Sequence, residues 1–189
     1  LAKKRSALTA VQDQFRARDT GKTYAALVLG HWPAALKVID VALHKTLDAR
    51  GERHVLPVAA DHPDGRRSIS LVQVVTAFQD CTLLDVTLKT GRTHQIRVHL
   101  QHEGHPIVGD DKYGDFALNK ALGRGSVNEP IQGVDRRQLP EGRFARMFLH
   151  ARYLRIDHPV TGEPLTLEAP LPADCAQLLT ALAPLDPAS

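Results

Sequence analysis

The feature that most constrains this fold is an abrupt change of hydrophobic period near residue 90. Between Cys81 and Lys89 apolar and polar side chains alternate, with Leu84, Val86 and Leu88 on one side. This alternation is typical of a half-buried strand. Thr90 and Gly91 then break the pattern, so the strand must end at a tight corner and a different element must follow it.

Two elements compete for the segment after that corner. Ile96 and Leu100 lie four residues apart, and Gly104 followed by Pro106 is typical of a helix end. Ile96, Val98 and Leu100 also alternate, as they would in a second strand. The Gly-Pro stop, together with a threonine available as a cap at the corner, favours the helix.

Arg92 would lie in the first turn of this helix. A cation is unfavourable there, because the helix N-terminus carries partial positive charge. We therefore expect an anionic group opposite Arg92, either a buried carboxylate or a phosphate. The alternative is a solvated surface arginine. Against it, the neighbouring polar run holds more hydrogen-bonding groups than stability alone requires, namely Thr93, His94, Gln95, Arg97 and His99.

The histidines of this segment raise the question of a metal site. His99 and His102 have the spacing of three that two zinc ligands need on one helix face. No carboxylate lies between them where a metalloprotease pattern requires it, His94 is five residues before His99, and His105 follows the expected helix end. We therefore expect no metal among them.

Composition narrows the class of protein. Hydrophobic residues make up 43% of the 189 residues, which suits one soluble domain. No run approaches the ~20 apolar residues of a membrane span, and no apolar signal segment opens the chain. Cys81 and Cys175 lie in a strand-like and a helix-like segment, which fits a reducing compartment. We expect no membrane association and a cytoplasmic location.

The net charge of +3 is only mildly basic, so it gives weak support to nucleic-acid binding. The distribution is more informative, because basic residues gather in two groups. Such groups supply salt-sensitive phosphate contacts, although each can also be an ordinary solvated face. The groups are Lys3, Lys4, Arg5, Arg16, Arg18 and Lys22 near the start of the chain, and Arg136, Arg137, Arg143 and Arg146 in a loop-like region.

The remaining patterns predict both strands and helices. Asp64 and Gly65 predict a hairpin into a long strand over 67–78, which would pair with 81–89, and residues 116–145 predict a long surface loop. The other expected elements are helices over 6–18 and 172–182, strands over 23–29, 38–43 and 55–59, and a hairpin of 147–156 with 164–168. This mixture indicates a single α+β domain on a largely antiparallel sheet.

Long stretches of the chain also resemble a known family. TGRTHQIRVHL at 90–100 and GHPIVGDDKYG at 104–114 closely resemble signatures of the RluA/RluC/RluD family of RNA pseudouridine synthases. LAKKRSAL, GKTYAALVLG, FLHA and HPVTGEPLTLEAPLP resemble that family too, and in its order. The RluC type, which acts on large-subunit ribosomal RNA, is the most similar. The resemblance covers most of the chain and is weakest over 34–68 and 116–146.

The resemblance implies that residues 1–189 form the catalytic domain of a bacterial enzyme of ribosomal-RNA modification, monomeric and without metal or cofactor. Its fold would be a central mixed, mainly antiparallel sheet flanked by helices and loops, with RNA in a cleft across it. The reaction breaks the N-glycosidic bond of a uridine, turns the base and rejoins it through carbon. The uridine must first be extruded from structured RNA, which costs a few kcal/mol.

The resemblance also implies roles for particular residues. Tyr24 matches the tyrosine that packs against the target base, and Arg92 matches the arginine that pairs with the catalytic aspartate and offsets its desolvation. Leu149 matches an apolar residue beneath the uracil, although its pattern fits a core strand leucine equally well. The expected RNA-binding residues are Leu149, Thr93, His94, Gln95, Ile96, Arg97 and His99.

One part of the family pattern is missing. The catalytic aspartate belongs to an Arg-Leu-Asp motif shortly before the segment that matches LAKKRSAL, so we expect it upstream of Leu1, together with an S4-type RNA-binding domain. Arg155-Ile156-Asp157 follows FLHA, in the wrong order, and is not assigned. The chain by itself would then be inactive. The alternatives are a non-catalytic RNA-binding module of the same fold and a metal-dependent hydrolase.

Overall fold

A six-stranded sheet with the order β2-β5-β6-β1-β7-β8 organises the fold, and every pair between its described strands is antiparallel. The computed structural model describes residues 2–17, 20–47, 51–124, 134–135, 137, 139, 143–183 and 185. The strands of this sheet are β1 (Gly21–Leu29), β2 (Val38–Asp40), β5 (Ile69–Ala77), β6 (Cys81–Leu88), β7 (Leu149–Asp157) and β8 (Pro164–Glu168). The mainly antiparallel α+β architecture is confirmed.

The centre of the sheet is formed by β1 and β6, which pair from Thr23 with Thr87 to Leu29 with Cys81. The run Ala25–Val28 in β1 is fully buried and belongs to the hydrophobic core, and β6 and β7 pair with the two edges of the strand. A continuous apolar run of this length is what a central strand requires. Gly30 ends β1 with a positive φ of 76°, a backbone conformation that glycine adopts at little cost.

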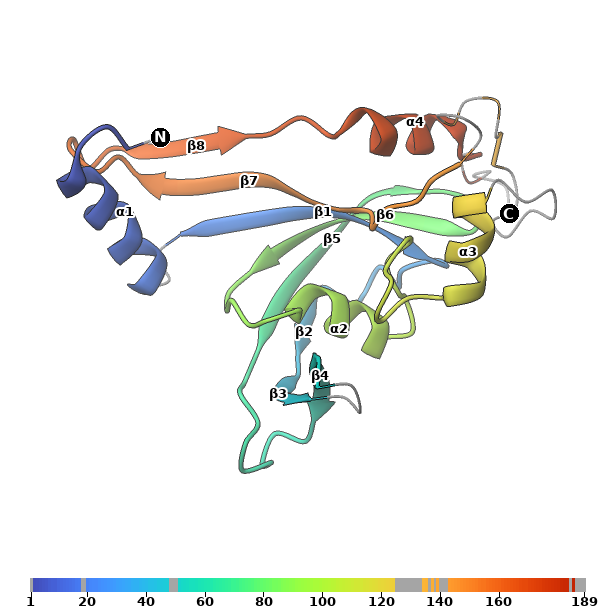
Figure 1. Cartoon of the computed structure of the whole chain (residues 1–189), viewed down its shortest axis with the longest axis horizontal. Helices are drawn as coiled ribbons and strands as arrows, with labels where there is room; N and C mark the ends of the chain where they lie inside the picture. The colour runs from blue at the N-terminus through green and yellow to red at the C-terminus, as the bar shows by residue number, and fades with distance from the viewer. Residues whose placement is uncertain are drawn as a thin grey trace.

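A second, two-stranded sheet consists of β3 (Ala42–Leu47) and β4 (Arg53–Val58) and projects from the main sheet as an arm (Figure 1). The predicted hairpin between β4 and β5 at Asp64-Gly65 is wrong, because β4 pairs with β3 while β5 pairs with β2 and β6. The turn at residues 62–65 only redirects the chain from the arm back to the sheet. The predicted pairing of β5 with β6 is confirmed.

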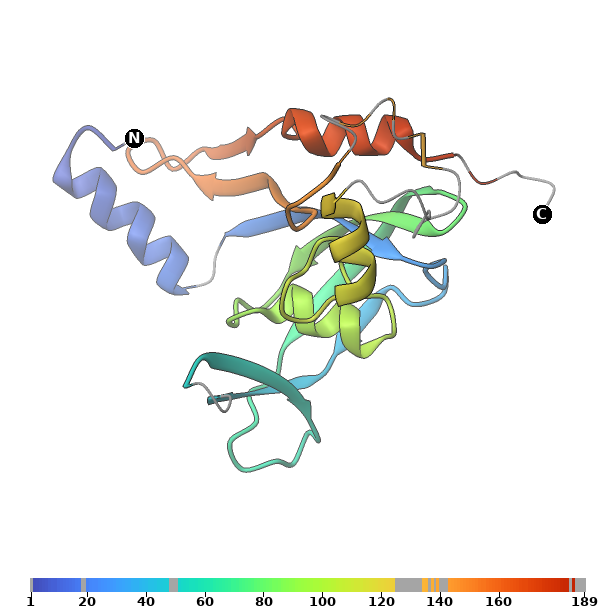
Figure 2. The same ribbon diagram turned by 45° about the vertical axis from the view of Figure 1, so that its right-hand side comes forward.

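Four helices complete the described elements: α1 (Arg5–Ala17), α2 (Gln95–His102), α3 (Phe116–Arg124) and α4 (Ala173–Ala181). Helix α2 lies between the main sheet and the arm, and α4 continues beyond the end of β8, on the side of the sheet away from the arm (Figures 1 and 2). The sequence patterns did not predict α3. This helix takes the place of the start of the expected loop, because burial of Leu118 and Leu122 stabilises one of its faces. Residues 125–133 of that expected loop lie outside the described residues.

Helix α1 matches the predicted helix closely but buries less than expected. None of its residues is fully buried, and Leu8 and Phe15 are 48% and 39% exposed. Its attachment is partly polar, since the Gln14 side chain donates to the Asp157 carbonyl oxygen and accepts from the Asp157 N–H, both at 2.8 Å. The last hairpin, β7 with β8, and helix α4 agree with the sequence prediction.

Candidate active site

Tyr24, Arg92 and Leu149 come from three distant parts of the chain and line one pocket of about 270 Å³. Tyr24 and Leu149 lie on neighbouring strands, because β1 pairs with β7 in a register that joins Ala26 to Leu149. Arg92 reaches the same place from the loop between β6 and α2. The full lining is Tyr24, Leu88, Arg92, His94, Gln95, Ile96, Arg97, Met147 and Leu149.

The loop that carries Arg92 is held by a buried glutamine. Gln95 Oε1 accepts hydrogen bonds from the Arg92 N–H at 3.0 Å and the Thr90 hydroxyl at 2.8 Å. Its Nε2 donates to the Ile69 carbonyl oxygen and to Ser70 Oγ, both at 3.0 Å. Gln95 is 2% exposed, so its amide fixes the loop to β5. Gln95 also lines the pocket, so its expected contact with RNA stays a prediction, although its amide is already hydrogen-bonded within the protein.

The expected position of Arg92 in the first helical turn is also wrong. Helix α2 begins at Gln95, and the residue before it, His94, has φ 53° and ψ 17°, the only positive φ of a non-glycine residue in the described chain. Thr90 does not cap the helix, because its hydroxyl is committed to Gln95 while accepting from the Ile69 N–H at 2.9 Å. Arg92 therefore lies in the loop, half-buried beside Tyr24.

Arg97 lies in an ion-pair network. Its Nε and one terminal nitrogen donate to the two carboxylate oxygens of Asp110 at 2.8 and 2.6 Å, and that nitrogen also donates to Asp111 at 3.0 Å. Burial works to raise the pKa of Asp110, but hydrogen bonds from Arg97 and from the backbone of Tyr113 and Lys112 outweigh it and lower that pKa. Arg97 thus braces α2 against residues 110–113. Arg97 also lines the pocket, so its expected contact with RNA stays a prediction.

His99 is fully buried and lines neither the pocket nor the cavity that contains Thr93. Its Nε2 donates to the Val41 carbonyl oxygen at 3.3 Å, so the Nδ1 of a neutral ring accepts from the Ser70 hydroxyl at 3.0 Å. Burial lowers the pKa of His99 to about 4. His99 is therefore a neutral interior histidine, and its predicted RNA contact is corrected because its side chain is fully buried.

His94, Ile96 and Thr93 line the cavities as well. His94 is half-buried at the pocket and Ile96, 5% exposed, contributes apolar lining. Thr93 instead lines a neighbouring cavity of about 410 Å³, which shares Arg92 with the pocket and extends along the arm. The other residues of that cavity are Leu43, His44, Lys45, Val55, Asp64, Arg66 and Gly91.

The structure describes most residues of the two predicted basic groups. Arg16 pairs with Asp13 at 2.9 Å, Arg137 pairs with Asp135 at 2.9 Å, and the Lys22 ammonium lies 4.5 Å from the Phe15 ring centroid. Arg18 and Arg136 lie outside the described residues. None of the described members of these groups lines the pocket that holds Tyr24.

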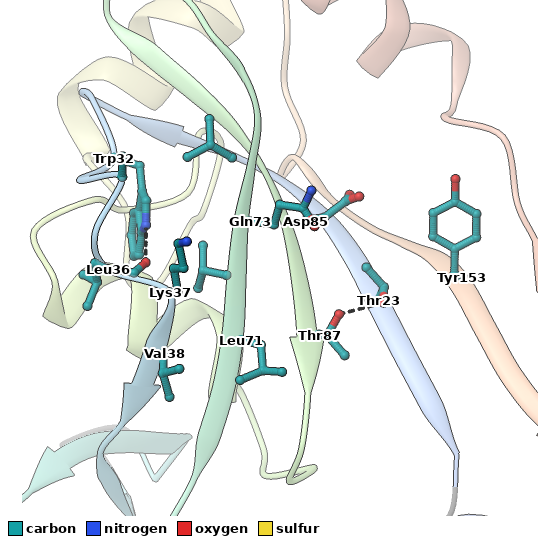
Figure 3. A pocket seen from close by; sticks show the side chains of 13 residues that line it. Thr23, Trp32, Leu36, Lys37, Val38, Leu71, Gln73, Asp85, Thr87 and Tyr153 are labelled. Carbon is teal, nitrogen blue, oxygen red and sulfur yellow. Dashed lines mark hydrogen bonds between the residues drawn. The ribbon is translucent and has the colours of Figure 1, made fainter.

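A larger cavity of about 870 Å³ lies on the opposite face of the sheet (Figure 3). Thr23 and Thr87 line it, whereas the adjacent Tyr24 and Leu88 line the pocket with Arg92. Successive side chains of a strand point to opposite faces, so the two hollows are separated by the sheet. Tyr153 and Asp85 also lie on this far side (Figure 3).

No aspartate or glutamate of the described residues lines the pocket with Tyr24 and Arg92. Asp157 lies at the end of β7, where its backbone is bonded to Gln14 of α1. This position agrees with leaving Asp157 unassigned.

Sequence reasoning missed two kinds of residue at this site. Met147 and Leu88 line the pocket, and Met147 lies two residues before Leu149, a spacing that signals a shared face in an extended chain. Tyr113 and Asp110 support His94 and Arg97 from outside the pocket. Both belong to the GDDKYG motif, but nothing in that motif shows which side chains they contact.

Of the described helices, none combines the length and apolar character needed to cross a bilayer.

Curated relatives are similar to nearly all of this chain. The proteins named ribosomal large subunit pseudouridine synthase C from Vibrio cholerae, Yersinia pestis and Escherichia coli are 37%, 39% and 37% identical to it over 180, 182 and 171 residues. These alignments cover 95%, 96% and 90% of the chain but 50%, 50% and 48% of the relatives. The chain therefore spans about half the length of the curated relatives it matches.

Solved structures share the fold. Human RNA pseudouridylate synthase domain containing 1 superposes with a TM-score of 0.68 at 26% identity, over 97% of this chain and 67% of that one. Human RNA pseudouridylate synthase domain containing 4 gives a TM-score of 0.66 at 23% identity, over 94% and 68%. The sequence profile of the RNA pseudouridylate synthase family matches residues 1–102, more than half of the chain. The chain therefore belongs to the RNA pseudouridylate synthase family.

Proposed function

We propose that residues 1–189 are the catalytic domain of an enzyme that converts uridine to pseudouridine in large-subunit ribosomal RNA. One observation carries the proposal: Tyr24, Arg92 and Leu149, which lie far apart in sequence, line a single pocket. The names of the curated relatives, which are large-subunit pseudouridine synthases, support the same RNA.

The pocket offers an aromatic wall and an apolar floor. Tyr24 presents a planar ring on which an extruded base can stack, while Leu149, Ile96 and Met147 supply apolar surface beneath it. Its volume of about 270 Å³ suits one nucleoside rather than a stretch of duplex. We assign Tyr24 to contact with the uracil, and the phenol is also the group there that can relay a proton at carbon.

Arg92 orients the attacking carboxylate in this proposal. A carboxylate in a partly dry pocket tends to stay protonated, and a guanidinium beside it favours the ionised form and fixes its direction by paired hydrogen bonds. We propose that this aspartate comes from sequence preceding Leu1. The described carboxylates do not line the pocket, which supports this assignment.

We propose that the RNA strand runs from the pocket along the arm. Arg92 lines both the pocket and the neighbouring cavity, where Lys45, Arg66 and Thr93 offer donors to phosphate oxygens. His94 adds a donor at the junction. This path contacts the backbone of RNA and leaves the choice of uridine to RNA shape and to parts outside the 189 residues.

The test uses the full-length polypeptide that contains this chain, incubated with large-subunit ribosomal RNA and assayed for pseudouridine by mass spectrometry. We expect Arg92→Ala and Tyr24→Phe to reduce turnover by about 100-fold, since each removes a group at the reacting nucleoside. Arg67→Ala and Tyr153→Phe are matched controls, because Arg67 pairs with Asp40 away from the pocket and Tyr153 lies on the far face.

The controls should retain normal turnover. Unchanged turnover of Arg92→Ala would overturn the assigned role. A wild-type protein that binds this RNA but forms no pseudouridine would instead establish the non-catalytic RNA-binding module.

A further inference from the structure

Two histidines and an aspartate gather at the base of the arm, away from the histidines of α2. His44 lies on β3, while His62 and Asp64 lie in the connection between β4 and β5. One potential ligand atom from each side chain lies within 4.8 Å of the others, and the two imidazole centroids are 5.2 Å apart. Among the described residues, these are the three side chains that come close enough to share a metal ion.

The backbone holds these three residues in place before any ion arrives. Leu43, next to His44, and Arg66 exchange two backbone hydrogen bonds of 2.9 Å, which fasten β3 to the connection. Within the connection, the His62 N–H donates to the Ala59 carbonyl oxygen at 3.0 Å and the Gly65 N–H donates to the His62 carbonyl oxygen at 2.9 Å. A site whose backbone is already fixed loses little conformational entropy when a ligand binds.

The hydrogen bonds of the imidazoles also bear on ligation. The Asp64 carbonyl oxygen lies 3.4 Å from His44 Nδ1, so a neutral ring donates from Nδ1 and keeps a lone pair on Nε2. Metal-binding histidines are commonly oriented by such a carbonyl. His62 differs, because its Nδ1 accepts from the Asp64 N–H at 3.1 Å. A metal at His62 must therefore displace that N–H or select the other tautomer.

We propose that His44, His62 and Asp64 form a site for a divalent transition metal of the Zn²⁺ type. Two imidazoles and one carboxylate are the ligands that such ions prefer over Mg²⁺ or Ca²⁺. Three protein ligands leave one tetrahedral position for water. His44 and Asp64 also line the cavity of about 410 Å³ that contains Arg92, so that position has room. The bound ion would link β3 to the β4–β5 connection and so hold the arm beside the candidate active site.

The affinity of the purified protein for Zn²⁺, measured by competition with a chromophoric chelator, tests the proposal directly. The visible absorption of the Co²⁺-loaded protein reports the coordination geometry of the site. We expect one ion per chain and a Co²⁺ spectrum of a tetrahedral site. His44→Ala, His62→Ala and Asp64→Asn should each weaken binding by about 100-fold, since loss of a ligand costs at least as much as loss of a supporting group. His102→Ala is the control, because this exposed histidine lies at the end of α2.

A melting curve with excess chelator shows whether each variant folds. Asp64 is exposed, so Asp64→Asn should have the melting temperature of the wild type under these conditions. This variant therefore still tests the proposal if a histidine variant does not fold. The proposal is overturned if folded wild-type protein binds neither ion, or if His102→Ala weakens binding as much as the three ligand variants. Neither readout involves RNA, so failure here leaves the proposed enzyme activity unaffected.

Discussion

The Tyr113 hydroxyl lies 2.9 Å from His94 Nδ1 and joins the arm to the candidate active site. The Val55 N–H on β4 donates to the same hydroxyl at 3.0 Å, so the proton of Tyr113 is available to His94. His94 Nδ1 then accepts, and the neutral ring carries its own proton on Nε2. Burial, followed by the nearby charges of Arg97 and Lys112, lowers the pKa of His94 and favours this neutral form.

Tyr113→Phe should weaken this connection without emptying the space that the ring fills. The Val55 N–H loses its buried acceptor, and His94 loses the donor that fixes its tautomer and its left-handed turn. We expect a loss of about 1–3 kcal/mol in the free energy of unfolding in urea, and weaker RNA binding measured at constant salt. Tyr153→Phe, on the far face, is the control; an equal loss in both variants would show that the hydrogen bonds at Tyr113 are unimportant.

Arg97→Met should be strongly destabilising. The Asp110 side chain is 1% exposed and Arg97 is 13% exposed, so the variant leaves a buried carboxylate with only its backbone donors. Breaking one side of a buried ion pair typically costs about 3–5 kcal/mol. Arg67→Met removes an exposed partner of Asp40 and should leave the urea midpoint unchanged. Similar midpoints for the two variants would contradict the structural role of Arg97.

His99 makes stability depend on pH in a defined direction. The pKa of the buried ring is lowered to about 4, because burial disfavours its charged form, whereas the unfolded ring takes up a proton near its ordinary pKa of about 6.5. Between these values the unfolded state binds more protons, so the free energy of unfolding falls as pH decreases. We expect a loss of about 2 kcal/mol between pH 7.5 and pH 5, to which His94, whose pKa is also lowered, adds in the same direction.

The check is urea unfolding of the wild type and of His99→Gln over this pH range. Glutamine can still hydrogen-bond to Ser70 and to the Val41 carbonyl oxygen but does not titrate. The variant should therefore show a shallower pH dependence. A slope as steep as that of the wild type would mean that other groups cause the effect.

Gly109→Ala should cost much more stability than Gly104→Ala. Both residues have positive φ, 77° and 84°, so both substitutions carry the cost of about 1 kcal/mol of that conformation. At Gly104 the new methyl group meets nothing within 4 Å, whereas at Gly109 it overlaps the backbone carbonyl of Arg146. Displacing backbone there moves the chain that leads to Met147 and Leu149. Equal melting temperatures of the two variants would show that a methyl group at position 109 does not clash with the Arg146 backbone.

The sequence predicted well where the signal was local. The apolar run after Lys22 and the alternation after Cys81 identified β1 and β6, and the glycine at 104 ended α2 near the expected place. Pairing across long separations was harder, since the Asp64-Gly65 turn looked like a hairpin but joins strands that do not pair. Helix α3 was missed because its turn-rich surroundings hid two buried leucines.

The candidate site shows the same division. The polar run after Thr90 indicated a functional segment, and the family resemblance of the sequence identified Tyr24, Arg92 and Leu149. The fold brings these three residues to one pocket. The sequence could not divide that run by burial, because burial depends on which face of α2 meets β5 and the arm. Only the tertiary contacts show that Gln95, Arg97 and His99 spend their hydrogen-bonding groups on other residues of the protein. Arg92 and His94 reach the pocket wall from the loop before α2, because the Gln95 amide fixes that loop to β5.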